Sequence, residues 1–312
     1  MSNTNLVSIV GAGHSGSTLL DLVLGMNTEI TSVGEISNWD EYISKNKLCS
    51  CGEPTHNCDF WSRIAHRWIE RQKSNQTDGL NTNTNSSSLV GWANRIRHQC
   101  SLFATALLPI QNLPFLMNIL HPTALKRAAN ISKLFDLIRL ESGSPIVCDS
   151  SKSVFRFRLM HALNPGKTKA IYLTRDGRAV AASHYRRVGK PPKASARSWR
   201  FINIYTQIML RTVKEDTFMH VRYEELCREP EKTLKGICQF IGCPYQNGML
   251  EFVNSSHQPH NIGGNRMRMS GLSEIREDLK WRTVFSKSQL DEFNRTAGRI
   301  NARILGTYYL QH

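Results

Sequence analysis

The chain has 312 residues, of which 40% are hydrophobic and 21% are charged. This length suits one large α/β domain or two small ones, and the hydrophobic content is ordinary for a globular protein. The net charge of +15 is not ordinary, and it suits an anionic ligand, a nucleic acid or an anionic membrane surface.

No targeting or membrane segment is recognisable in the sequence. The first residues carry no basic segment before a long apolar core, and the longest apolar stretch, residues 102–120, is interrupted by two prolines and several amide side chains. We therefore expect no secretory signal and no membrane span. The eight cysteines lack the pattern of a small secreted scaffold, and a cytoplasmic location is the expectation.

Five short runs have the pattern of β-strands: Leu6–Val10, Glu29–Val33, Pro145–Cys148, Lys169–Thr174 and Phe218–Arg222. Helical patterns separate several of them, and the clearest cover Ser17–Leu24, Pro230–Ile241 and Ser286–Leu305. Alternating strands and helices predict an α/β fold with a parallel sheet and helices on both faces.

The segment GAGHSGST, Gly11–Thr18, follows the first predicted strand and opens a predicted helix. Its spacing is that of a phosphate-binding loop, except that Ser17 stands where the lysine belongs. Glycines and a helix N-terminus can hold a phosphate without a lysine, but a triphosphate normally needs one. A nucleotide with one 5′-phosphate-type group therefore suits this loop, and a strand-to-helix turn without a ligand is the alternative.

A helical insert of residues 61–140 separates the second predicted strand from the third. Within it, residues 74–88 are polar and nearly uncharged, which predicts a mobile loop. We expect a single domain over residues 1–312 with this insert inside it.

A second motif runs from the fourth predicted strand into a helix, as Thr174-Arg175-Asp176-Gly177-Arg178 followed by Ser183. Arg175 leaves the strand at the sheet edge where open α/β sheets bind ligands. An arginine and a hydroxyl form a suitable receptor for a second phosphate. Pairing of Arg175 and Asp176 with their neighbours is the alternative.

The lysine-free loop and the strand–R-D-G-R–helix–Ser motif together resemble the sulfotransferases that use 3′-phosphoadenosine 5′-phosphosulfate (PAPS), in the style of the bacterial and tyrosylprotein branch. The resemblance spans most of the chain. It implies a P-loop-like, three-layer α/β fold with a five-stranded parallel sheet, in agreement with the strand pattern.

The resemblance also assigns the donor site. The 5′-phosphosulfate falls on His14, Ser15, Gly16, Ser17 and Thr18, and the 3′-phosphate on Arg175 and Ser183 with Arg187 as a helper. Tyr223 resembles the position near the adenine. Arg266 and Arg268, in the glycine-containing segment 261–268, resemble a flexible loop that closes on the 3′-phosphate side. Many relatives have arginine or lysine where His14 stands, so a neutral His14 weakens the charge at the sulfuryl group.

Sulfuryl transfer needs a base for the acceptor and a positive charge for the leaving oxygen. By the resemblance, Glu35 after the second strand is the general base and Lys152 after the third strand steadies the leaving oxygen. His14, His161 and His184 are alternative bases. The implied reaction is an in-line displacement at sulfur that requires no metal.

Cys49, Cys51 and Cys58, with His56 between them, form a cluster that the reaction does not use. They could supply a Cys₃His zinc set, but the spacing is cramped for paired C-x-x-C knuckles. A disulfide is also open, and packing beside Phe60 and Trp61 is the preferred interpretation.

The predicted function is PAPS-dependent sulfation of a hydroxyl, amine or guanidinium-type nitrogen of a small molecule. A bacterial natural product or an alkaloid toxin such as saxitoxin fits, although no residue singles it out. The alternatives are a tyrosylprotein or glycan/lipid sulfotransferase and a P-loop nucleotide kinase. A nucleic-acid partner is not expected, because no RNP-type stretch or zinc-finger spacing is present. The insert is expected to roof the acceptor pocket with Trp68, Trp92, Phe103 and Phe115.

Overall fold

The computed structural model describes residues 4–75, 122–251, 259–270 and 274–306. Five parallel strands form one sheet in the order β2-β3-β1-β4-β5. The strands are β1 Leu6–Val10, β2 Ile30–Ser32, β3 Ile146–Lys152, β4 Thr168–Thr174 and β5 Phe218–Arg222. All five predicted strands are confirmed, and β3 runs further than predicted, so that Lys152 is its last residue.

Helices connect the strands and cover both faces of the sheet. Their bounds are α1 Ser17–Gly25, α2 Trp39–Ser44, α3 Asp59–Asn75, α6 Pro122–Ser142, α7 Val154–Leu163, α8 Gly177–Val188, α9 Pro192–Leu210, α10 Tyr223–Arg228, α11 Pro230–Ile241, α12 Met267–Ser270, α13 Trp281–Val284 and α14 Lys287–Ile304. The three predicted helices are confirmed as α1, α11 and α14. Ser286 begins α14 as half of a capping box with Gln289, the signature of a helix start.

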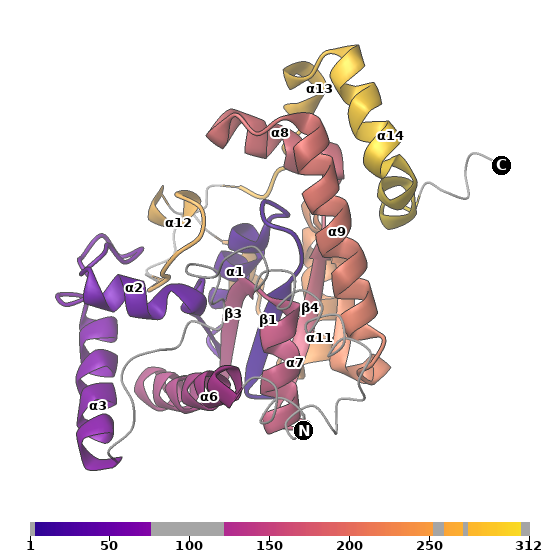
Figure 1. Ribbon diagram of the computed structural model, residues 1–312. Helices are drawn as coiled ribbons and strands as arrows, with labels where there is room; N and C mark the ends of the chain where they lie inside the picture. The colour runs from indigo at the N-terminus through magenta and orange to yellow at the C-terminus, as the bar shows by residue number, and fades with distance from the viewer. Residues whose placement is uncertain (1–3, 76–121, 252–258, 271–273, 307–312) are drawn as a thin grey trace.

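The alternation of side chains along β1 explains the layers. Val7 and Ile9 pack with α1 and α11 on one face of the sheet, whereas Val10 packs with α7 and α9 on the other. In Figure 1, α2, α3 and α6 lie on the β3 side of the sheet, and α13 and α14 lie beyond α8 and α9 on the opposite side. The predicted three-layer α/β fold is confirmed.

The predicted insert lies between β2 and β3, and its described part consists of α3 and α6. Helix α3 continues through Asn75, so the first two residues of the predicted loop 74–88 are helical, and residues 76–88 lie outside the described part. Trp68 is only 4% exposed and belongs to the core between α3, α6 and the sheet. In the described ranges no helix has both the length and the apolar character that a membrane crossing requires.

Parallel strands bring their carboxyl ends to one edge of the sheet. At that edge, β1 is followed by the glycine loop, β2 by Glu35, β4 by Arg175 and β5 by Tyr223, while Lys152 ends β3. Each strand thus delivers a predicted site residue to the same edge.

Candidate active site

The loop between β1 and α1 depends on glycine for its path. Gly16 has a left-handed backbone (φ +90°), and a Cβ there would lie 2.4 Å from Cδ2 of Tyr223. His14 is also left-handed (φ 64°), which is uncommon for a residue with a side chain. Gly16 caps α1 without a side-chain hydrogen bond, so the first amides of the helix remain available to an anion.

Glu35 and Lys152 form an ion pair between Oε1 and Nζ, and their side chains are 20% and 21% exposed. Asn38 Nδ2 donates to the other oxygen of Glu35 at 3.2 Å. Lys152 has a left-handed backbone (φ 67°), and its carbonyl accepts from the amide of Gly11 at 3.3 Å. Residues with a strained backbone cluster at functional sites. Here the hydrogen bond from Gly11 joins the end of β3 to the glycine loop.

Arg175 is 7% exposed and lies with its guanidinium carbon 4.3 Å from the centre of the Tyr223 ring. Its Nη1 donates to the His14 carbonyl at 3.2 Å, and within the described residues its buried Nε–H has no hydrogen-bond partner. Ser183 Oγ lies 3.1 Å from His14 Nδ1. The arginine, the hydroxyl and the loop are thus held against one another.

The glycine loop, the Glu35–Lys152 ion pair and Arg175 with Ser183 line one cleft of about 570 Å³. A cleft of this volume is large enough for a nucleotide-sized ligand. The predicted residues that line it are His14, Gly16, Ser17, Thr18, Glu35, Lys152, Arg175, Ser183, Arg187 and Tyr223. Ser15 is buried beneath the loop, 1% exposed, and its hydroxyl has no partner in the described part of the chain. The glycine loop, the Glu35–Lys152 ion pair and Arg175 with Ser183 therefore meet in one cleft.

Comparison with protein families decides the assignment, because residues 7–247 match the sulfotransferase family. The chain belongs to the sulfotransferase family. It is therefore a transferase, and the nucleotide-kinase alternative is not supported.

One solved structure supports the fold of this sulfotransferase. The sulfotransferase domain of the Synechococcus PCC 7002 olefin synthase is similar to it with a TM-score of 0.51 and 18% identity, over 95% of both chains. A sulfotransferase domain from the curacin biosynthetic pathway is also similar, with a TM-score of 0.49 and 18% identity over 95% of this chain and 97% of that one. A search of curated proteins found no match.

The segment 261–268 of the sulfotransferase lies beside the Glu35–Lys152 ion pair, not beside Arg175. Ile262 pairs with Gly34, and a Cβ on Gly264 would lie 3.6 Å from Oε1 of Glu35. Arg268 donates to the Tyr42 hydroxyl at 3.0 Å, and neither Arg266 nor Arg268 is among the residues that line the cleft. The prediction that these two arginines close on the 3′-phosphate side is therefore not supported by their positions.

A different segment of the sulfotransferase lies beside Arg175, and no motif in the sequence indicated it. Arg175 Nη2 donates to the carbonyl of Asp278 at 3.1 Å, and the Asp278 carboxylate lies 3.0 Å from Arg186 and 3.7 Å from Arg175. The Tyr223 hydroxyl accepts from the amide of Asp278 at 3.2 Å and donates to the carbonyl of Arg276. Glu274, Arg276 and Asp278 therefore belong to the wall of the cleft on the side of Arg175.

On the side of Glu35, the cleft is lined by Asn38, Glu41 and Tyr42 at the start of α2, and by Lys47 beyond it. Asn38 and Tyr42 are four residues apart, the spacing of one helix face, so the pattern could have indicated them. The described part of the insert contributes no residue to the lining. Its predicted role as a roof fails for Trp68, which is in the core, and Trp92, Phe103 and Phe115 lie outside the described residues.

Of the three histidines considered as alternative bases, His14 is the one that lines the cleft. Burial, together with the charges of His184, Arg187, Lys152 and Arg175, lowers the pKa of His14 to about 4, so the ring is neutral near pH 7. His184 packs edge-on against His14, with ring centres 4.5 Å apart. His161 contacts the carbonyl of Thr168 at 3.3 Å, at the start of β4, the opposite end of that strand from the cleft.

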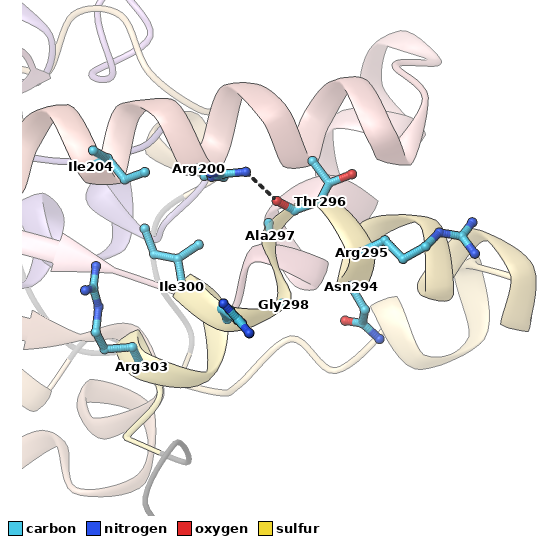
Figure 2. Close-up of a pocket in the computed structure, with 10 residues that line it drawn as sticks. Arg200, Ile204, Asn294, Arg295, Thr296, Ala297, Gly298, Ile300 and Arg303 are labelled. Atoms are coloured by element: carbon cyan, nitrogen blue, oxygen red, sulfur yellow. Dashed lines mark hydrogen bonds between the residues drawn. The ribbon is translucent and has the colours of Figure 1, made fainter.

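A larger hollow of about 760 Å³ lies elsewhere, between α9 and α14. Figure 2 shows Arg200 from α9 donating to the carbonyl of Thr296, with Arg295 and Arg303 along the rim. It contains none of the predicted site residues and no carboxylate that could act as a base. The predicted site residues therefore gather in the smaller cleft and not in this hollow.

Proposed function

We propose that this sulfotransferase moves the sulfuryl group of PAPS to a hydroxyl, amine or guanidinium-type nitrogen of a small molecule. The observation that carries the proposal is that the glycine loop, Arg175 with Ser183, and the Glu35–Lys152 pair line one cleft. Two receptors for phosphate and one acid–base pair are the parts that this reaction needs.

The residues fit a donor with two separate phosphate groups. The loop amides and the start of α1 suit the 5′-group, and the buried guanidinium of Arg175, with an unpartnered Nε–H in the described structure, suits the 3′-phosphate. Tyr223 packs against both Gly16 and Arg175, so one aromatic ring fixes the spacing between the two receptors. PAPS supplies an activated sulfuryl group on a phosphate leaving group.

In the proposed reaction, Glu35 accepts the proton of the attacking O–H or N–H group. As the new bond to sulfur forms and the bond to the phosphate oxygen breaks, Lys152 and the loop amides stabilise the negative charge on that oxygen. The ion pair between Glu35 and Lys152 places the base and the cation at the same point of the cleft. That point is where acceptor and donor have to meet.

The acceptor side of the cleft is polar, which suits a small molecule with hydroxyl or nitrogen groups. Its walls are Asn38 just before α2, Tyr42 on α2, Lys47, and Gly263 with Gly264. Saxitoxin-like alkaloids, tyrosylprotein and glycan or lipid acceptors are alternatives within the same reaction class. A cytoplasmic location, the absence of a nucleic-acid partner and a single domain stay predictions.

Turnover of PAPS with a panel of acceptors tests the proposal. The panel contains a phenol, a primary alcohol, an alkylguanidine and a tyrosine peptide, and mass spectrometry measures the gain of one SO₃ group. Glu35→Gln is expected to lower kcat by about 10²- to 10⁴-fold, as for loss of a general base, and to change the affinity for 3′-phosphoadenosine 5′-phosphate (PAP) by less than about twofold.

His14→Asn is the comparison variant. Because its ring faces Ser183 and is neutral, it is expected to raise KM for PAPS more than it lowers kcat. A Glu35→Gln enzyme with wild-type kcat would contradict the assignment of the base. PAPS that is neither bound nor consumed would contradict the donor.

A further inference from the structure

Four potential metal ligands meet outside the cleft, and the reaction uses none of them. They are the thiols of Cys49, Cys51 and Cys58 and the imidazole of His260, whose ligand atoms all lie within 4.8 Å of one another. Within the described residues, none of the three cysteines forms a disulfide. Cys49 and Cys58 are buried, whereas Cys51 and His260 are partly exposed.

The separations match the edges of a zinc tetrahedron. Nδ1 of His260 lies 3.3 Å from Sγ of Cys58 and 3.9 Å from Sγ of Cys49. Zinc with a Zn–S bond of about 2.3 Å and a Zn–N bond of about 2.0 Å places tetrahedral S and N ligands about 3.5 Å apart. These two separations lie within a few tenths of an ångström of that value, and the widest pair of the set, at no more than 4.8 Å, needs to close by about 1 Å for the four side chains to share one ion.

Contacts between residues 50–61 and residues 260–261 fix this geometry. Ser50 binds the chain next to His260, because its amide donates to the Asn261 carbonyl at 3.1 Å and its hydroxyl accepts from the Asn261 amide at 2.7 Å. Trp61 Nε1 donates to the His260 carbonyl at 2.8 Å, and the Phe60 ring stacks on the imidazole with centres 5.2 Å apart. The histidine is thus held before any metal binds.

We propose that Cys49, Cys51, Cys58 and His260 bind one structural Zn²⁺. Three thiolates and one imidazole complete a tetrahedral shell and leave no position for a substrate, which is the mark of a structural site rather than a catalytic one. The thiols lose their protons as the ion binds, so the affinity falls at acidic pH.

His56, the histidine that the sequence placed beside the cysteines, is not a ligand. Its Nε2 lies 2.7 Å from the carbonyl of Ile43. The fourth ligand is His260 instead, which is distant from the cysteines in the sequence. The preferred interpretation of the cysteines as simple packing is replaced by this four-residue set.

The proposed ion stabilises the wall of the cleft that residues 261–264 form beside Glu35. His260 leads directly into Asn261–Gly264, and there the Ile262 carbonyl accepts from the amide of Glu35 at 2.6 Å while the Ile262 amide donates to the Val33 carbonyl at 3.1 Å. A metal that joins residues 49–58 to His260 therefore holds the strand-like segment that supports Glu35.

The zinc content of the full chain, purified under reducing conditions without a chelator, tests the proposal and does not depend on activity. We expect about one zinc per chain in the wild type, and at least a tenfold loss of zinc affinity in Cys58→Ser and His260→Ala. His260→Cys restores a four-ligand set, as in Cys₄ sites, and is expected to retain the metal.

Two matched controls separate this site from adventitious binding. His56→Ala removes the histidine nearest in sequence, and Cys227→Ser removes a free cysteine on α10; both are expected to keep one zinc. Co²⁺ added to the metal-free wild type should give the visible bands of a tetrahedral thiolate site.

The proposal is overturned if reduced wild-type chain takes up no stoichiometric zinc or cobalt when the metal ion alone is added. It is equally overturned if His56→Ala loses the metal while His260→Ala keeps it, or if two of the three thiols are found in a disulfide. Because zinc is measured directly, failure here leaves the sulfotransferase proposal standing, and the reverse also holds.

Discussion

The carboxylate of Asp278 lies at the proposed receptor for the 3′-phosphate, and its removal is expected to strengthen the binding of PAP. It contacts Arg186 at 3.0 Å and Arg175 at 3.7 Å. Burial favours the neutral acid, but the hydrogen bond from the Lys280 amide and the two arginines outweigh it and lower the pKa of Asp278. The group is therefore ionised at pH 7 and repels a phosphate that approaches Arg175.

The expected gain follows from Coulomb's law. A phosphate bound to Arg175 would lie about 7 Å from the carboxylate, where two unit charges interact by about 1 kcal/mol at an effective dielectric constant of about 40. A phosphate charge between one and two gives about 1–2 kcal/mol, or about 5- to 30-fold in Kd. Asp278→Asn keeps the backbone hydrogen bonds to Arg175 and Tyr223 and removes only the charge.

Calorimetric titration with PAP and with AMP, which lacks the 3′-phosphate, measures the effect. Asp278→Asn should tighten PAP and leave AMP nearly unchanged, and the gain should shrink as salt is added. Glu274→Gln is the matched control, because it removes the same charge from a cleft residue that pairs with Arg276. Weaker PAP binding, or an equal gain for AMP, would show that the Asp278 carboxylate does not repel the 3′-phosphate.

Two further predictions concern the loop and a buried acid. Gly16→Ala adds a Cβ at a left-handed position against Tyr223, so PAP and AMP should both bind at least about tenfold more weakly; Gly13→Ala, with nothing within 4 Å of its Cβ, should change neither affinity. Burial raises the pKa of Asp21 to about 7, so the folded chain holds an extra proton between about pH 4 and 7, and this group makes stability fall as pH rises through that window. Asp21→Asn removes this titrating group. Its gain in the free energy of unfolding over the wild type, measured with urea, should be about 2–3 kcal/mol larger at pH 7.5 than at pH 5. A parallel pH dependence of the two proteins would show that Asp21 is ionised throughout this range.

The sheet and the residues at its edge could be predicted because both follow from local patterns. A residue that ends a strand or directly follows it, such as Lys152 or Arg175, lies at the carboxyl end of that strand. Parallel pairing brings the carboxyl ends of the strands together at one edge of the sheet. The order of the strands need not be known for this inference. The resemblance then assigned roles to residues that the strand ends had already gathered.

What could not be predicted depends on contacts between distant segments. Asp278 reaches Arg175 because Tyr223 binds the backbone on both sides of Glu277, and no local pattern records such a contact. His260 reaches the cysteines because residues 261–262 return beside β2, whereas His56 is near them only in sequence. Trp68 occupies the core instead of the cleft because the apolar face of α3 packs on α6.

The central claim is that the cleft binds a nucleotide with separate 3′- and 5′-phosphate groups, and titration with PAP, AMP and ATP·Mg²⁺ tests it most directly. We expect PAP to bind at least about tenfold more tightly than AMP, since Arg175 makes charge-assisted hydrogen bonds to the 3′-phosphate in the proposed complex. Arg175→Ala should abolish the difference while AMP binding persists, and Arg200→Ala, in the other hollow, should leave the preference intact. Tighter binding of ATP·Mg²⁺, or a preference for PAP that survives Arg175→Ala, would show that the cleft is not a site for this nucleotide.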